Sequence, residues 1–360
     1  MPMLVYKPIN DDGTKNDLVS KSGLDKLRFM PVFWYSSPLA QSFMFNILQA
    51  AESCLDFEDE IIQLSDTGRL CLSWNYDPER PKKGIVIVVT AASGSTKRPY
   101  NENLAYEAIQ NGFNTVVFNF RGGNGWKLTT SRMYSELSHD DFRDAVDHIH
   151  AKYPEDKIYA IGNSLGSSVI CHHINDFALK KKKSFLSGAV WISSMFNQTI
   201  SHHDLENYIF GYVSRSLGEG IKLRVLEQKH MFSEMEKDYG IDFKRMYSDK
   251  CSRTHDVFDV FVSKQAGCKN VYEYYEAAKL TDKIQNFNVK TLFLSAYDDV
   301  FTGNKSLPFE EIKKNQDTYL MVTHSGGHLA FYDKFLSPKQ WSPIPCMKFI
   351  NYLHSSNKSE

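Results

Sequence analysis

The feature that most constrains the fold of this chain is an alternation of apolar, β-branched runs with helical stretches. The run "GIVIVVT" over 84–90 is apolar almost throughout, as expected for a strand buried on both faces of a sheet. The same pattern predicts strands over 115–120, 157–162 and 188–193, and helices over 100–111, over 138–152 and from Ser164. Strands that alternate with helices predict a mostly parallel sheet with helices on both faces.

The alternation is interrupted and then resumes. Residues from about 195 to 285 are rich in charged and aromatic residues, favour helix and contain no clear parallel strand. Strands are again predicted over 289–296 and 318–323, and a terminal helix from about 343. We therefore predict an α/β fold with an inserted helical cap at about 195–285, over the carboxyl edge of the sheet, where such folds place their sites.

The beginning of the chain is patterned differently. Residues 1–50 show little periodicity and are predicted to form an arm packed on a single domain that spans 51–360. Within that domain, 60–74 reads as a β-hairpin, because two β-rich runs flank the turn signal Asp66-Thr67-Gly68.

Composition excludes several classes of function. Apolar residues make up 42% and charged residues 24% of the chain, as in ordinary globular proteins. Lys plus Arg number 42 and Asp plus Glu 43, so there is no net charge that would favour nucleic acid as a partner. The lysine run 180–183 is interpreted as a solvated loop after a helix.

The cysteines and the absence of targeting signals indicate a location. No two of the six cysteines have CxxC spacing, so they are expected to be free thiols in a reducing compartment, without a zinc site. No stretch has the pattern of a signal peptide. The least polar window, 29–48, is interrupted by two prolines and several polar residues, and so falls short of a membrane span. We expect an intracellular, cytoplasmic protein.

One short motif carries the chemistry. "GNSLG", residues 162–166, lies between the predicted strand 157–162 and the helix that follows. Such a GxSxG sequence is either a tight turn that needs small residues or a nucleophile elbow, which lifts a serine hydroxyl above the sheet. The strand before it and the helix after it favour the elbow, with Ser164 as the nucleophile.

A serine nucleophile needs a base, and the base needs a carboxylate to orient it. In α/β-hydrolases both follow the serine, in the order acid and then histidine. Asp298 and Asp299 come directly after the strand 289–296, and His328 follows the next strand behind two glycines. Adjacent carboxylates on an extended segment point opposite ways, so one faces the histidine and the other solvent or a backbone cap. We favour Asp298, with Asp299 as a competitor.

The alternatives for the base and the oxyanion hole are also limited. His324 is less suited than His328 because it lies before the glycines. The expected oxyanion donors are the backbone N–H groups of Leu165, the residue after the nucleophile, and of Ala92, in the loop after 84–90. The Gly-rich "RGGNGW" lacks the GK[ST] ending of a phosphate loop. No metal or organic cofactor is expected.

The chain resembles one branch of the α/β-hydrolases, the bacterial YheT-type proteins and the eukaryotic ABHD esterase/lipase group. The matching blocks, in the order of that group, are "SDTGRLCLSW", "FNFRGGNGWKLTTSRMYSE", "HDDFRDAVDHIHAKYP", "YAIGNSLGSSV", "VYEYYEAAKLTDKI", "SAYDDVF" and "SGGHLAF". The resemblance covers roughly 30–355. It implies a catalytic triad at Ser164, Asp298 and His328 that hydrolyses or transfers acyl chains, often medium-length, of esters or glycerolipids.

Two departures from that group stand out. Its members usually carry glycine early in the oxyanion loop, as in HGLTG, whereas this chain has Ala91-Ala92-Ser93-Gly94. Eukaryotic members often have an N-terminal membrane anchor, and no such segment is found here. Any membrane contact is therefore expected to be peripheral, through apolar residues of the cap or the arm.

The sequence thus predicts a serine esterase or lipase acting on short- to medium-chain acyl esters. The alternative is a hydrolase fold kept as an inactive structural or interaction subunit, which the altered oxyanion loop favours. The aromatic residues of the cap are interpreted either as an acyl pocket or as ordinary core. They are Phe196, Tyr208, Phe210 and Tyr212.

Overall fold

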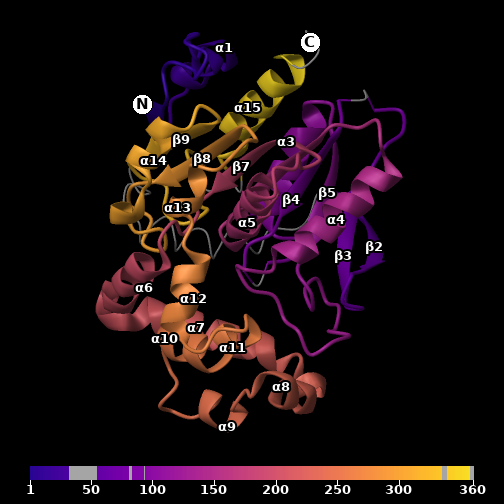
Figure 1. Ribbon diagram of the computed structural model, residues 1–360, viewed down its shortest axis with the longest axis vertical. Coiled ribbons are helices and arrows are strands. Elements are labelled where there is room, and N and C mark those ends of the chain that lie inside the picture. Colours follow the sequence, from indigo (N-terminus) through magenta and orange to yellow (C-terminus); the bar gives the residue numbers. More distant parts are fainter. Residues whose placement is uncertain (32–54, 81–82, 93, 335–338, 357–360) are drawn as a thin grey trace.

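The computed structural model describes residues 1–31, 55–80, 83–92, 94–334 and 339–356. Its centre is a nine-stranded sheet with the order β1-β9-β8-β7-β6-β4-β5-β3-β2 (Figure 1). The strands are β1 (Met3–Tyr6), β2 (Glu58–Gln63), β3 (Arg69–Asn75), β4 (Ile85–Val89), β5 (Asn114–Asn119), β6 (Ile158–Asn163), β7 (Leu186–Ile192), β8 (Thr291–Ala296) and β9 (Thr318–Thr323). Strands β4 to β9 pair in parallel, whereas β1, β2 and β3 are antiparallel to their neighbours.

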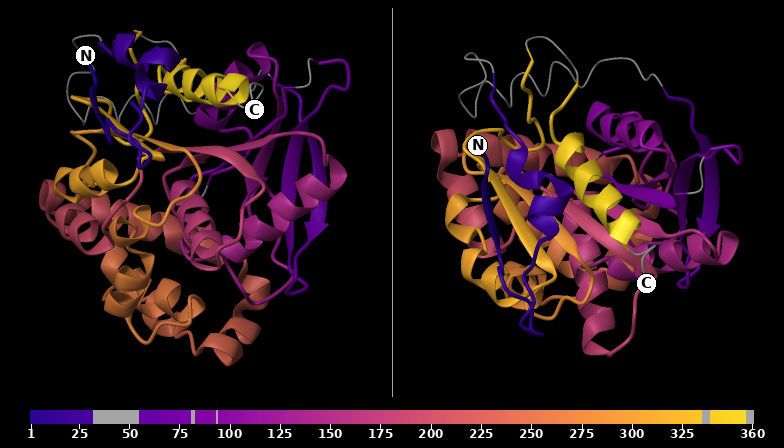
Figure 2. Two further views of the ribbon diagram at one scale, coloured as in Figure 1. Left: turned by 45° about the horizontal axis from the view of Figure 1, so that its top comes forward. Right: turned by 90° about the horizontal axis from the view of Figure 1, so that it is seen from above.

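Helices cover both faces of the sheet, because each buried strand presents alternate residues to opposite sides. In β4, Ile85, Ile87 and Val89 belong to one apolar cluster, and Val86 and Val88 to the other. The helices that cover the sheet are α1 (Leu18–Ser22), α3 (Pro99–Gln110), α4 (His139–Lys152), α5 (Leu165–Leu179), α14 (Phe309–Lys314) and α15 (Pro343–Ser356). Helices α4, α5 and α14 pack on the first cluster, and α1, α3 and α15 on the second (Figure 2). The predicted α/β-hydrolase architecture is confirmed.

A group of helices separates β7 from β8. They are α6 (Gln198–Asn207), α7 (Tyr212–Leu226), α8 (Phe232–Tyr239), α9 (Phe243–Met246), α10 (Thr254–Val257), α11 (Ser263–Gln265), α12 (Val271–Ala278) and α13 (Thr281–Ile284). Most of them lie below the sheet in Figure 1. Gln228 and Gln265 accept hydrogen bonds from the backbone of Leu128 and Met133, at 2.9 Å and 2.8 Å. These helices, called the helical insertion below, are therefore tied to the loop after β5.

The N-terminal residues contribute more than a packed arm. Strand β1 pairs with β9 and forms one edge of the sheet, which the weak periodicity of the first residues does not indicate. The predicted hairpin over 60–74 is confirmed as β2 and β3. The division into an arm over 1–50 and a domain over 51–360 stays a prediction. Residues 32–50 of that arm, and most of the apolar window 29–48, lie outside the described residues.

The register of the sheet gathers the candidate residues. Gly162 of β6 lies opposite Val89 of β4 and Trp191 of β7, and Ala296 of β8 lies opposite Thr323 of β9. The loops after β4, β6, β8 and β9 therefore leave the sheet along one edge. Every candidate site residue from the sequence lies in one of these four loops, except Leu165, which begins the helix α5 after β6.

Candidate active site

Ser164 occupies a strained corner between β6 and α5. Its backbone has φ +52° and ψ −113°, a conformation that L-residues adopt only under constraint. A Cβ at Gly162 would lie 2.6 Å from backbone atoms of Ser167, and one at Gly166 would lie 2.6 Å from the carbonyl oxygen of Val89. Both glycines are required because strand and helix approach so closely. The predicted strand–serine–helix corner is present.

His328 reaches the serine from the loop after β9. Its Nε2 lies 2.9 Å from Ser164 Oγ. The backbone N–H of Leu329 donates to Ser193 Oγ at 3.2 Å, which ties the histidine loop to the end of β7. The ring of Phe301 packs on the imidazole, with centroids 4.5 Å apart. The imidazole is therefore placed against the hydroxyl, as an active hydrolase requires and an inactive subunit does not.

Asp299, not Asp298, faces the histidine. Both carboxylate oxygens of Asp299 lie near His328 Nδ1, at 3.1 Å and 3.0 Å. The same carboxylate accepts the backbone N–H groups of Phe301 and Thr302, at 2.8 Å and 3.2 Å, and the Thr302 hydroxyl at 2.7 Å. The prediction that Asp298 faces the histidine is therefore wrong, because the turn after β8 directs the second aspartate inward.

Asp298 has the second role predicted for the pair, which is to cap the backbone. Its Oδ1 accepts the backbone N–H of Gly327 at 2.9 Å, directly before the histidine. The expectation that one carboxylate faces the histidine and the other caps the backbone is confirmed with the two residues exchanged. His324 is exposed at the end of β9, and no hydrogen bond from its ring to Ser164 is described.

The two carboxylates differ electrostatically. Burial alone would raise the pKa of Asp299, but the adjacent His328 and the hydrogen bonds it receives lower that pKa below the usual value. Burial raises the pKa of Asp298, and the neighbouring charge of Asp299 adds to the rise. Asp299 is therefore the carboxylate held ionised beside the imidazole.

The three side chains form one line of hydrogen bonds. An ionised Asp299 can only accept, so His328 Nδ1 carries the proton and Nε2 is left with a lone pair toward Ser164 Oγ. In this tautomer the imidazole can take the serine proton while the carboxylate stabilises the imidazolium. This chemistry is that of a serine nucleophile activated by a general base.

The candidate oxyanion donors are the backbone N–H groups of Leu165 and Ala92. Leu165 is the first residue of α5, so its N–H has no acceptor within the helix. Ala92 is exposed in the loop after β4. Neither Ala91 nor Ala92 has positive φ, so this loop does not need glycine at either position. Their role as donors stays a prediction.

The aromatic residues of the insertion do not form one acyl pocket. Phe196 is fully buried in the core of the sheet, whereas Phe210 is 95% and Tyr212 is 68% exposed. Tyr208 is half-buried, and its burial, together with the charge of Asp298, raises the pKa of this tyrosine. The four residues therefore form neither a shared pocket nor a shared core, and only Phe196 belongs to a core cluster. Membrane contact through this region stays a prediction.

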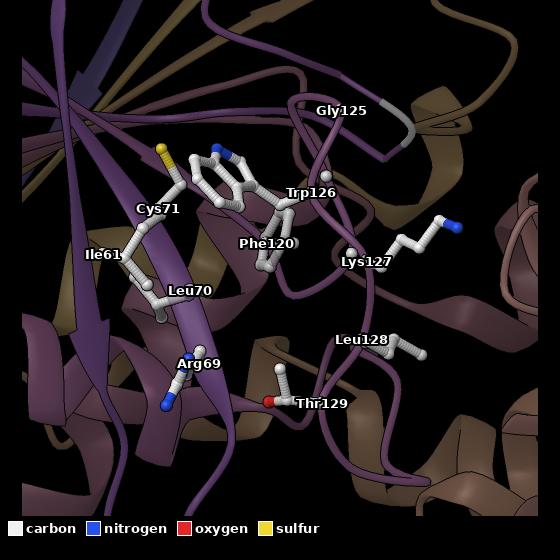
Figure 3. Close-up of a pocket in the computed structure, with 12 residues that line it drawn as sticks. Ile61, Arg69, Leu70, Cys71, Phe120, Gly125, Trp126, Lys127, Leu128 and Thr129 are labelled. Carbon is white, nitrogen blue, oxygen red and sulfur yellow. The ribbon is translucent and has the colours of Figure 1, made fainter. Parts of the chain in front are cut away.

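A separate pocket of about 470 Å³ opens between β3 and the Gly-rich loop 121–129. Figure 3 shows the rings of Phe120 and Trp126 in it, near Cys71, with Lys127 pointing away. Asp59 accepts a long hydrogen bond from the indole N–H of Trp126, at 3.4 Å. The lining contains none of the three residues of the hydrogen-bonded line, so this pocket is distinct from the serine site.

Other expectations concern groups outside the site. Cys71, Cys171, Cys251, Cys268 and Cys346 are free, and Cys54 lies outside the described residues. Within the described ranges, no three His, Cys, Asp or Glu side chains are arranged to hold a metal ion. In the same ranges, no helix has both the length and the apolar character needed to cross a bilayer. The lysine run 180–183 is an exposed turn after α5.

Comparison with known proteins identifies the family. The model of the serine aminopeptidase family S33 matches residues 80–335, well over half of the chain. The chain belongs to this family. S33 members are hydrolases, and the nine-stranded sheet together with the match makes the chain an α/β-hydrolase of the ABHD esterase and lipase type.

Among curated relatives, phospholipase ABHD3 of Bos taurus is 24% identical over 316 residues, covering 85% of this chain and 73% of the relative. Monoacylglycerol lipase of Saccharomyces cerevisiae is 28% identical over 291 residues, covering 78% of this chain and 63% of the relative. The esterase Pf2001 of Pyrococcus furiosus superimposes with a TM-score of 0.52 at 15% identity, covering 90% of this chain and 95% of the esterase. This structural likeness supports the fold alone.

Proposed function

We propose that the protein is a serine carboxylesterase or lipase that cleaves short- to medium-chain acyl esters, including those of glycerolipids. That it is an ester-hydrolysing enzyme follows from its family and its relatives. The observation that supports a serine mechanism is the unbroken line from Ser164 Oγ through His328 to Asp299. The names of two relatives, a phospholipase and a monoacylglycerol lipase, support a glycerolipid substrate.

The mechanism begins with attack by the serine. Ser164 Oγ forms a bond to the ester carbonyl carbon while its proton moves to His328 Nε2. The carbonyl oxygen becomes an oxyanion, which accepts hydrogen bonds from the N–H groups of Leu165 and Ala92. In a comparable hole, the loss of one donor lowers kcat by about 10²- to 10³-fold. Asp299 holds the imidazole in position and stabilises its positive charge.

The intermediate then collapses. The bond from carbon to the leaving oxygen breaks, His328 gives its proton to the departing alcohol, and the acyl group remains on Ser164. Water attacks the acyl carbon while its proton moves to His328; the bond between that carbon and Ser164 Oγ then breaks, His328 returns the proton to Oγ, and the acid is released. If an alcohol takes the place of water, the product is a new ester, so the same site supports acyl transfer.

The test is labelling by a fluorophosphonate probe, which reacts with activated serines. We expect wild type to be labelled and Ser164→Ala not to be. A series of p-nitrophenyl esters from C2 to C16 then gives the preferred chain length, for which we expect an optimum at short to medium chains. A folded wild type that is neither labelled nor active on any ester would overturn the proposal.

A further inference from the structure

A buried chain of hydrogen bonds joins the strand that carries the serine to the loop after β4. Asn163, the residue before Ser164, donates from Nδ2 to Asn101 Oδ1 at 3.1 Å. The Nδ2 group of Asn101 donates to Thr90 Oγ1 at 2.9 Å and to the carbonyl oxygen of Ser95 at 2.8 Å. Thr90 and Ser95 flank the stretch 91–94, which contains the expected oxyanion donor Ala92.

Both polar atoms of the Asn101 side chain are hydrogen-bonded in this chain. Its oxygen accepts from Asn163, and its two N–H groups serve Thr90 and Ser95. Asn101 and Thr90 are fully buried, and Asn163 is 1% exposed. Hydrogen bonds in such a dry environment are stronger than in water, and leaving one unmade is costly. The amide therefore has one favoured orientation and fixes the two segments relative to each other.

The far end of the same loop is anchored as well. Thr96 Oγ1 lies 2.8 Å from Ser73 Oγ and 3.1 Å from Asn119 Oδ1, and all three side chains are buried. Near the middle, a Cβ at Gly94 would lie 2.0 Å from Thr90 Oγ1, so the loop is pressed against the threonine that Asn101 binds. Side chains thus hold the loop at both ends, and Asn101 alone of these anchors also reaches the serine strand.

Resting on the proposed function, we propose that Asn101 is a positioning residue for the oxyanion hole. The two donors belong to different segments of the chain. Leu165 follows the serine at the start of α5, and Ala92 lies in the loop after β4. Both N–H groups must lie at hydrogen-bond distance from the same oxygen atom to stabilise the oxyanion. A small displacement of either group therefore lowers the rate of reaction strongly. The bridge from Asn163 through Asn101 to Thr90 and Ser95 sets that spacing.

The experiment compares Asn101→Leu with a matched control. Leucine has a similar volume and removes all three hydrogen bonds. The control is Asn315→Leu, since Asn315 is also buried and donates to backbone carbonyls, including that of Phe287 at 2.9 Å. Asn315 precedes β9, at the edge of the sheet opposite the serine. Both variants are expected to lose thermal stability, measured by circular dichroism. Only Asn101→Leu is expected to have a lower kcat.

For Asn101→Leu we expect kcat on a p-nitrophenyl ester to fall by about 10- to 100-fold with KM almost unchanged, because only the transition state uses the hole fully. Affinity for a trifluoromethyl ketone, which forms a tetrahedral oxyanion on the serine, is expected to fall by the same factor. The pH dependence of kcat/KM is expected to keep its position, since the contacts of His328 and Asp299 are untouched.

A second variant keeps the test decisive if Asn101→Leu does not fold. Asn163→Ala removes one bond of the bridge and is expected to lower kcat and ketone affinity together, by about 3- to 10-fold. Wild-type kcat and ketone affinity in the folded variants would overturn the inference, as would a shifted pH profile, which would place the effect on the histidine. Failure of the proposed function is recognised separately, because wild type itself would then be inactive and unlabelled.

Discussion

Replacing one carboxylate by an amide distinguishes the roles of the two adjacent aspartates, Asp298 and Asp299. In Asp299→Asn the side chain keeps its size, and the N–H groups of Phe301 and Thr302 hold its oxygen where Oδ1 lies now. The amide nitrogen then takes the place of Oδ2 and points hydrogen atoms at His328 Nδ1. The retained oxygen also lies 3.1 Å from Nδ1, but it already accepts two backbone N–H groups. To avoid two donors facing each other, the imidazole therefore moves its proton to Nε2, and it can no longer accept the serine proton.

The size of the effect follows from that tautomer. When the acid of a serine triad is replaced by its amide and the histidine is left in the wrong tautomer, kcat falls by about 10⁴-fold, equivalent to about 5 kcal/mol in the barrier. We expect a loss of this order for Asp299→Asn. The matched variant Asp298→Asn retains an oxygen that accepts the Gly327 N–H, so its kcat is expected to change by less than about tenfold.

The measurement is kcat and KM for a short p-nitrophenyl ester, with urea unfolding of each variant to show that it is folded. Proton NMR of the imidazole N–H reports the tautomer directly, and in Asp299→Asn we expect the proton on Nε2. Equal losses in the two variants, or a larger loss in Asp298→Asn, would refute the assignment of Asp299 and the reasoning from the turn after β8.

Three further predictions concern stability. Burial raises the pKa of Glu136 to about 7, although the hydrogen bonds from Tyr274 and Gln198 lower it. Between about pH 4.5 and 7, Glu136 therefore keeps its proton in the folded protein and has lost it in the unfolded chain. Stability should therefore decrease by about 3 kcal/mol as pH rises through this window, and urea unfolding of Glu136→Gln should lack that decrease. Gly166→Ala should abolish labelling and lower the yield of folded protein, because its Cβ would lie 2.6 Å from the Val89 carbonyl oxygen. Phe210→Gly should raise the free energy of unfolding by about 1 kcal/mol and leave ester hydrolysis unchanged, because Phe210 is 95% exposed at φ +54°.

Much of the fold could be predicted because local sequence encodes it strongly. The strands β4 to β9 are continuous apolar runs, which are typical of buried strands and not of amphipathic surface elements. The glycines around Ser164 are needed because the strand and the helix approach too closely there for a Cβ atom. Strand β1 could not be predicted in the same way, because only four residues pair and the partner β9 lies more than 300 residues along the chain. Its place at the edge comes from tertiary pairing, not from local preference.

The sequence does not distinguish the two aspartates, because each is followed two and three positions later by residues with a backbone N–H group, and the fold decides which carboxylate accepts them. Asp299 is followed two and three residues later by Phe301 and Thr302, whose N–H groups it accepts, and such local capping is typical of aspartate in turns. Asp298 has no comparable bond to the residues that follow it among those described. The exposure of Phe210 could not be read from the sequence, since Ile209 and Phe210 both have positive φ, which branched and bulky residues rarely adopt.

The site also shows why a parallel sheet suits this chemistry. The nucleophile, the base, the acid and the oxyanion loop come from four segments spread over more than 200 residues, and each is held where a buried strand ends. The sheet register fixes those ends coarsely. Further hydrogen bonds then link the segments around the site: the Gly327 N–H donates to Asp298 between two loops, and Asn163 at the end of β6 donates to Asn101 in α3. On this division, polar substitutions in the links should lower both rate and stability, whereas apolar truncations in β4 or β6 should lower mainly stability.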